Sequence, residues 1–205
     1  LMKENEMNKI FNLIMIFILT TFLQSKELEI GSQIPLFEVK MDQVNGNPIS
    51  LKDAMGKKGL IVIFSCNTCP WVLAWEDRYN LIYKKYKDKG IDMVAINSNQ
   101  GTRNSGDSMS DMIKHAKKAK YEFSYTLDEK SKLATAFGAT KTPHVYLFDS
   151  NGKLVYKGAI DDNSRNPKKV EDNYLMDALD SVVAGKKISQ VSTKAIGCTI
   201  KYVDN

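Results

Sequence analysis

The stretch GLIVIFSCNTCP, residues 59–70, joins a continuous apolar run to a C-x-x-C pair that is followed directly by proline. Residues 59–64 are apolar and rich in β-branched side chains, which is typical of a strand buried on both faces in a parallel sheet. Apolar and aromatic residues then recur at three- and four-residue steps over residues 70–89, which predicts a helix. The sequence therefore predicts a buried strand that delivers Cys66 and Cys69 to the start of a helix.

A cysteine pair at the start of a helix has a chemical use. The helix N-terminus carries about half a positive charge and free N–H groups, so a thiolate there is stabilised. Cysteine pKa values fall from ~8.5 to ~3.5–7.5 in such places, and the second sulfur can attack a mixed disulfide formed by the first. Proline is tolerated best at the first helical position, so Pro70 favours Cys69 as the cap and as the thiol of lower pKa. In the alternative, Cys66 is the cap and Pro70 lies deeper in the helix, where proline is disfavoured.

The rest of the chain alternates strand and helix patterns around this unit. Strands are predicted over residues 32–40, 91–97, 144–148 and 154–158, and helices over residues 108–120, 129–137 and 167–184. A strand–helix–strand unit followed by an antiparallel hairpin gives an α/β fold with a mixed central sheet flanked by helices.

Composition limits the classes of protein to which the chain can belong. It has 205 residues, of which 43% are hydrophobic and 26% charged, as in ordinary globular domains. Its 29 Lys and Arg against 24 Asp and Glu give a net charge of +5. Only Arg78, Arg103 and Arg165 are arginines, and no stretch interleaves arginine with aromatic residues, so nucleic-acid binding is not expected.

The N-terminal segment has the pattern of an export signal. Lys3 and Lys9 precede an apolar run over residues 10–23, which is short because a membrane-spanning helix needs about 20 apolar residues. This indicates a signal peptide over residues 1–25, with an uncleaved membrane anchor as the alternative. Both interpretations place the remainder in the bacterial periplasm or cell envelope. Residues 26–205 are predicted to form one domain, with a tail from about residue 186.

The chain has three cysteines, so at least one has no intrachain partner at any moment. No second C-x-x-C and no H-x-x-x-H accompany the pair, so a closed four-ligand metal site is not expected, and no cofactor is expected. A purely structural disulfide between Cys66 and Cys69 remains an alternative. The third thiol, Cys198, is predicted either to be a resolving partner for the pair or to be a free buried cysteine.

Thr142-Pro143-His144 precedes a predicted strand, and with the C-x-x-C-P it resembles the thioredoxin-like superfamily. The resemblance implies a cis peptide bond before Pro143, with the pair Thr142 and Pro143 facing the redox cysteines. The backbone of Thr142 would then pair with an extended substrate next to the sulfur. His144 is an accessory candidate that tunes the cysteines, or alternatively an ordinary strand residue.

The resemblance covers about residues 28–185 and is narrowest to the redoxin group, which includes alkyl hydroperoxide reductase and thiol-specific antioxidant proteins. Its motifs in this chain are GSQIPLFEV (31–39), IFSCNTCPWV (63–72), VAINSN (94–99), KTPHVYLFDSNGKLVYKGAIDDN (141–163) and GCTIK (197–201). They are similar to those of bacterial peroxiredoxin-like proteins with a thioredoxin fold. Typical peroxiredoxins have a threonine where Cys66 stands and an arginine near the position of His144.

The resemblance and the C-x-x-C pair imply a thiol–disulfide oxidoreductase, and the N-terminal segment implies that it is exported. Its expected partners are a disulfide-bearing protein or small molecule and a reductant of the envelope, with contact to a membrane only through an uncleaved N-terminal helix. A peroxiredoxin-like thiol peroxidase with an antioxidant role is the first alternative. The second is a copper(I)-binding chaperone, in which the two thiolates and His144 would hold the metal.

Overall fold

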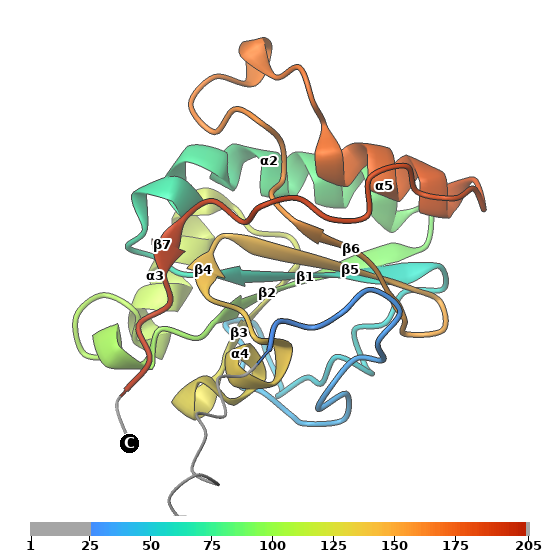
Figure 1. The fold of residues 1–205 in the computed structure, drawn as a ribbon. Helices are drawn as coiled ribbons and strands as arrows, with labels where there is room; N and C mark the ends of the chain where they lie inside the picture. Colours follow the sequence, from blue (N-terminus) through green and yellow to red (C-terminus); the bar gives the residue numbers. More distant parts are fainter. Residues whose placement is uncertain (1–25, 204–205) are drawn as a thin grey trace, which may run out of the picture.

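The computed structural model describes residues 26–203 and has a five-stranded sheet with helices on both faces (Figure 1). The sheet order is β3-β2-β1-β5-β6. The strands are β1 Gly59–Ser65, β2 Ile91–Asn97, β3 Ser124–Leu127, β5 His144–Asp149 and β6 Leu154–Gly158. The helices are α2 Pro70–Lys87, α3 Met109–Ala119, α4 Lys132–Phe137 and α5 Tyr174–Val183, with short 3-10 turns η1 Gln100–Thr102, η2 Glu129–Ser131 and η3 Pro167–Lys169.

The central strand β1 has a parallel neighbour on one side and an antiparallel neighbour on the other. It runs parallel to β2 over seven residue pairs, from Gly59↔Ile91 to Ser65↔Asn97. It pairs antiparallel with β5, which places Phe64 opposite His144. The predicted mixed sheet of an α/β fold is therefore confirmed, and all seven residues of β1 are buried, as its unbroken apolar run predicts.

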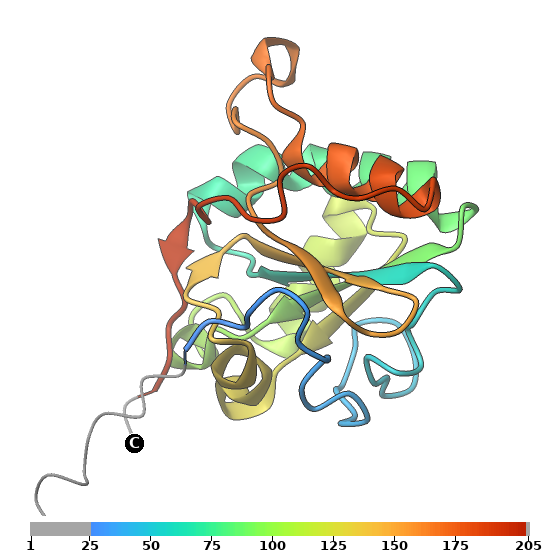
Figure 2. The same cartoon turned by 45° about the vertical axis from the view of Figure 1, so that its right-hand side comes forward.

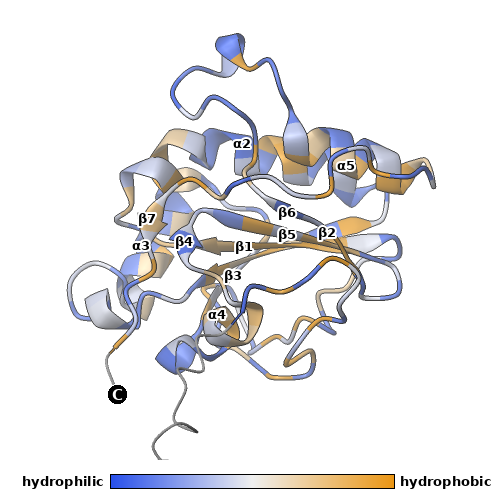
Figure 3. Ribbon diagram, in the orientation of Figure 1, coloured by the Kyte–Doolittle hydropathy of each residue, from blue (hydrophilic) through white to orange (hydrophobic). Residues whose placement is uncertain are grey.

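Alternate side chains of β1 enter two hydrophobic cores. Ile61 and Ile63 pack in the core that α2, α3 and α5 cover. Leu60 and Val62 pack in the opposite core, which is covered by α4 and by residues 34–54. Each of these side chains contributes about 1.5–3 kcal/mol on full burial. Figure 3 shows β1 as a hydrophobic strand between the two layers, so the strand is held in place on both faces up to the residue before Cys66.

The predicted strand over residues 32–40 is wrong. The segment forms a single bridge between Gln33 and Lys153 and then turns. Pro35 has no backbone N–H with which to continue a ladder, and Leu36 takes a left-handed conformation with a φ of 52°. Alternation of apolar and polar residues alone was therefore not enough to specify a strand.

The helix predicted over residues 167–184 is shorter than expected. Only Pro167–Lys169 form a 3-10 turn, and α5 begins at Tyr174. The residues between them are extended because the Asp162 side chain accepts a hydrogen bond from the backbone N–H of Glu171, at 3.1 Å. This contact spans a loop and has no signature in the local helical pattern.

A second, two-stranded sheet was not predicted. It consists of β4 Lys141–Thr142 and β7 Cys198–Thr199, which run antiparallel. Figure 2 shows β7 beside β4 at one edge of the molecule, where the C-terminal tail returns to the end of the main sheet. The predicted signal peptide over residues 1–25 lies outside the described residues. Within residues 26–203, the longest helices are too short or too polar to span a bilayer.

Candidate active site

The two cysteines of the C-x-x-C lie between the end of β1 and the start of α2. Cys69 is the N-cap of α2, with extended backbone angles of φ −78° and ψ 121°, and Pro70 occupies the first helical position. This confirms the position predicted for Cys69 from the fixed φ of proline. Both Cys66 and Cys69 are buried, and all three cysteines of the chain are free thiols.

Both sulfurs meet the chain at Thr142, just before a cis peptide bond. The Thr142–Pro143 bond is cis, as the resemblance to the thioredoxin-like superfamily implied. The Cys69 sulfur lies 3.1 Å from the carbonyl oxygen of Thr142. The Cys66 sulfur lies 3.5 Å from the Thr142 hydroxyl. The structure therefore brings together the four residues predicted as the centre of the site.

The pKa values of the two thiols are shifted in opposite directions. A hydrogen bond from the Cys66 thiol is the largest influence on Cys69, and it lowers the pKa of Cys69 to about 4 although burial opposes the change. The backbone N–H of Val72, in the first turn of α2, also stabilises the Cys69 thiolate. The same shared hydrogen bond, together with burial, raises the pKa of Cys66 well above its ordinary value. Cys69 is therefore the more acidic of the two thiols, and Cys66 is the one that keeps its proton.

The third cysteine belongs to the same group of sulfurs. Cys198 opens β7, pairs in register with Thr142 and packs against Cys66 and Cys69. Burial, and after it the neighbouring Cys69, raises the pKa of Cys198. Cys198 is only partly buried, whereas the other two cysteines are buried.

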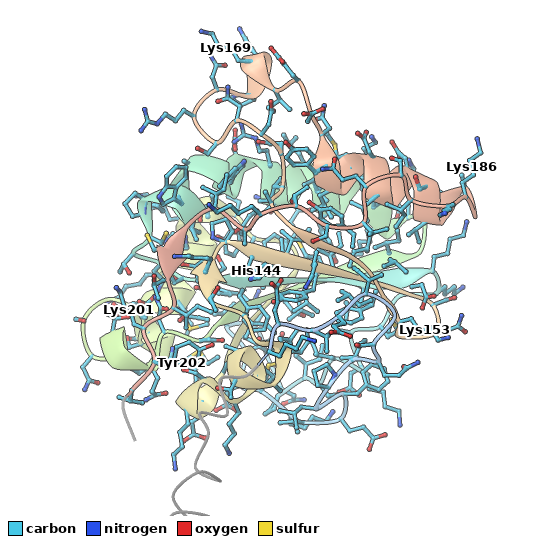
Figure 4. All side chains as sticks on the ribbon, viewed as in Figure 1. His144, Lys153, Lys169, Lys186, Lys201 and Tyr202 are labelled. Carbon is cyan, nitrogen blue, oxygen red and sulfur yellow. The ribbon has the colours of Figure 1, made fainter. Side chains whose placement is uncertain are left out.

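His144 faces away from the sulfurs. It follows Pro143 but belongs to β5, and its ring stacks on Tyr146 with centroids 4.5 Å apart. Its Nε2 lies 3.1 Å from a carboxylate oxygen of Glu27. Figure 4 shows His144 inside the molecule at the start of β5. Tyr146 belongs to the core that α4 covers, on the opposite side of the sheet from α2, so the structure does not join His144 to the cysteine group.

Asp107 holds the C-x-x-C loop and is a site residue that was not predicted from the sequence. This buried carboxylate accepts hydrogen bonds from the backbone N–H of Asn67 at 2.9 Å and from the hydroxyl of Thr68 at 3.2 Å. It also accepts from Asn97 at 2.8 Å and from Thr102 at 2.7 Å. The signal available in the sequence was an aspartate in the polar loop that follows β2. Because β2 runs parallel to β1, the two strands end side by side, and this loop begins beside the C-x-x-C.

Two of the three arginines pair with groups other than the cysteines. The guanidinium of Arg78 pairs with the buried Asp161 carboxylate at 2.9 Å and ties α2 to the loop after β6. That of Arg103 donates to the backbone oxygens of Asp107 and Asn97. Neither arginine contacts a cysteine. Over residues 26–203, no three or more His, Cys, Asp or Glu side chains converge as metal ligands would.

Residues 29–174, well over half of the chain, match the family described as Redoxin. The chain belongs to the Redoxin family. This redoxin is 26% identical over 137 residues to the thiol-disulfide oxidoreductase ResA of Bacillus thuringiensis subsp. konkukian (strain 97-27), covering 65% of the chain and 72% of that relative. The family and these relatives confirm the prediction of an oxidoreductase of the thiol-disulfide class.

Solved structures confirm the thioredoxin-like fold of the redoxin. An uncharacterized conserved protein from Geobacillus kaustophilus superposes with a TM-score of 0.81 at 33% identity, covering 88% of this chain and 96% of that one. The thioredoxin domain of a thiol-disulfide oxidoreductase from Bacteroides vulgatus superposes with a TM-score of 0.55 at 24% identity, covering 65% of this chain and 90% of that one. The latter similarity concerns the fold alone.

Proposed function

We propose that this redoxin exchanges disulfides through Cys66 and Cys69, with Cys69 as the attacking thiolate. The convergence of both sulfurs on Thr142 carries this proposal, because it places a sulfur of depressed pKa beside a proton-holding one. A thiolate that forms at low pH is available at neutral pH without a separate base. The ResA relatives, named for the same class of reaction, support the proposal.

The proposed reaction has two displacements. The Cys69 thiolate attacks one sulfur of a partner disulfide, that S–S bond breaks, and the released partner thiolate takes up a proton. The Cys66 thiol then loses its proton and attacks the Cys69 sulfur of the mixed disulfide, which releases the second partner thiol. The redoxin ends with a Cys66–Cys69 disulfide and the partner with two thiols, so one dithiol has been oxidised and one disulfide reduced.

The proposal extends to where the reaction takes place. The basic start and apolar run over residues 3–23 support export to the bacterial envelope, where a dithiol reductant would return the oxidised pair to thiols. The reduction potential of the Cys66–Cys69 pair determines whether the redoxin reduces or oxidises its partners. A potential near about −270 mV suits a reductant and one near about −120 mV suits an oxidant.

Single serine substitutions of the two cysteines test the exchange. With a disulfide-bridged peptide as substrate and dithiothreitol as reductant, Cys66→Ser and Cys69→Ser should each lose multiple turnover when made in a Cys198→Ser background, which leaves no third thiol beside the pair. In that background, Cys66→Ser should also accumulate a mixed disulfide with the peptide, visible by mass spectrometry. Ser105→Ala, an exposed serine in a nearby loop, is the control and should keep full turnover. Full turnover in both cysteine variants would overturn the proposal.

A further inference from the structure

The C-terminal tail occupies the strand edge beside the sulfurs. Cys198 pairs with Thr142 and Thr199 with Lys141, in antiparallel register. The ladder continues with a hydrogen bond of 3.0 Å from the Ile200 N–H to the carbonyl of Thr140. Extended peptides bind proteins by adding a strand to a free edge in this way. The place next to the cysteines where we expected a substrate backbone is therefore taken by the chain itself.

The fit of the tail depends on a glycine. A Cβ added at Gly197 would lie 2.1 Å from the carbonyl oxygen of Thr142, so a side chain there cannot be accommodated without moving the tail. Beyond β7 the tail is anchored again, by hydrogen bonds from Lys201 to the Asn99 side chain at 3.0 Å and from Gly101 to Lys201 at 2.7 Å. Figure 4 shows Lys201 and Tyr202 along this same edge. The tail is thus seated against the site on both sides of Cys198.

The tail also brings a sulfur to the helix start. Cys198 packs against Cys66, Cys69 and Val72, and Val72 lies in the first turn of α2. The backbone N–H groups of a first helical turn have no partner within the helix and stabilise negative charge. Cys66, Cys69 and Cys198 therefore form one packed group of sulfurs, in which Cys66 and Cys69 are buried and Cys198 is partly exposed.

We propose that the tail is an internal substrate strand and that Cys198 is a third redox thiol, which carries the disulfide between the buried pair and the surface. The step rests on the proposed exchange at Cys66 and Cys69. The Cys198 thiolate attacks the Cys69 sulfur of the Cys66–Cys69 disulfide, that bond breaks, and Cys66 leaves and takes the proton that Cys198 gave up. The product is a Cys69–Cys198 disulfide, with no net oxidation, and a dithiol reductant then attacks its exposed sulfur.

Disulfide mapping in two matched variants tests the pairing. Full-length Cys66→Ser and Cys69→Ser proteins, each with two remaining cysteines, are equilibrated in mixtures of reduced and oxidised glutathione, alkylated and mapped by mass spectrometry. Cys66→Ser should form the Cys69–Cys198 disulfide in preference to glutathione adducts. Cys69→Ser lacks the sulfur that Cys198 is proposed to attack and should carry glutathione on Cys198 instead. Glutathione on Cys69 with a free Cys198 in the first variant would overturn the proposal.

Kinetics of the Cys198 variants separate this proposal from the proposed function. Dithiothreitol should reduce the oxidised Cys198→Ser and Cys198→Ala proteins about tenfold more slowly than the unmodified protein, because their remaining disulfide is buried. An unchanged rate would overturn the role of Cys198 and leave exchange at Cys66 and Cys69 standing. Failure of the unmodified protein to form any Cys66–Cys69 disulfide would instead overturn the proposed function.

Discussion

The two sides of the C-x-x-C loop are held in opposite ways. On one side, the buried carboxylate of Asp107 accepts hydrogen bonds from the loop itself and from the neighbouring strand end, including the Asn67 N–H. On the other side, the loop meets the cis-proline turn and β7, a strand of two residues whose first residue is partly exposed. One side is a buried polar network and the other a short strand near the surface.

This difference shows where the sulfurs can change partners. Disulfide exchange requires one sulfur to move away and another to approach, and buried networks with every group satisfied resist such movement. Short strands with few buried contacts open at low free energy cost. The Asp107 side therefore fixes the position of the loop, and the β7 side is the one through which we propose that exchange with a partner proceeds.

Removing the carboxylate on the fixed side should have the largest effect. Asp107→Ala leaves the Asn67 N–H and its other buried donors without an acceptor, so we expect a loss of about 3 kcal/mol in the free energy of unfolding. Urea denaturation of the reduced protein measures this loss. Asp107→Asn keeps one acceptor oxygen and should lose about half as much. A change below about 0.5 kcal/mol for the alanine variant would mean that the network does not hold the loop.

Loss of the hydrogen bond between Cys66 and Cys69 should have the next largest effect, and it should change the pKa of Cys69. The pKa of Cys69 is about 4, so its thiolate is present above that pH and is protonated as the pH falls through it. The rate of alkylation by iodoacetamide should therefore be level from about pH 5 to 8 and fall below about pH 4. Cys66→Ala removes the donor and should move the midpoint upward by at least about one pKa unit, equivalent to about 1.4 kcal/mol.

Cys66→Ser is the matched control for that measurement. Its hydroxyl still donates to the Cys69 sulfur, so its midpoint should lie below that of the alanine variant. Thiolate absorbance near 240 nm follows the same titration without a reagent. Equal midpoints for the two variants would show that the acidity of Cys69 comes from the helix N-terminus rather than from its partner.

A substitution in the tail, on the β7 side of the loop, should make the Cys69 sulfur more accessible to reagents. Gly197→Ala places a methyl group against the Thr142 carbonyl, so it should loosen the tail and raise the alkylation rate of Cys69 about fivefold, equivalent to about 1 kcal/mol in tail docking. The adjacent Ile196 is 39% exposed, and Ile196→Ala is the control with no expected change. A lower rate in the glycine variant would contradict the idea that the tail covers the sulfur.

The same contrast explains how much of the site the sequence predicts. The strand, the cysteine pair and the cap at Cys69 are local, because an apolar run and one proline specify them within residues 59–70. Asp107 and Cys198 reach the site from other parts of the chain, through the parallel strand β2 and through β7. Their positions depend on packing of the whole fold. β7 has only two residues and carries no periodic pattern from which a strand is predicted.

Substitution of His144 should have the smallest effect on the pKa of Cys69. It tests whether the two faces of the sheet act independently at the cysteine site. It is next to Pro143 in sequence, yet its neighbours are Glu27 and Tyr146 on the far side of the sheet. His144→Gln should therefore shift the pKa of Cys69 by less than about 0.3 units, within the range of distant, additive substitutions. Thr142→Val, which removes the hydroxyl 3.5 Å from the Cys66 sulfur, should shift the titration of the pair more. A larger shift from the histidine variant would mean that the two faces of the sheet are coupled at the cis peptide.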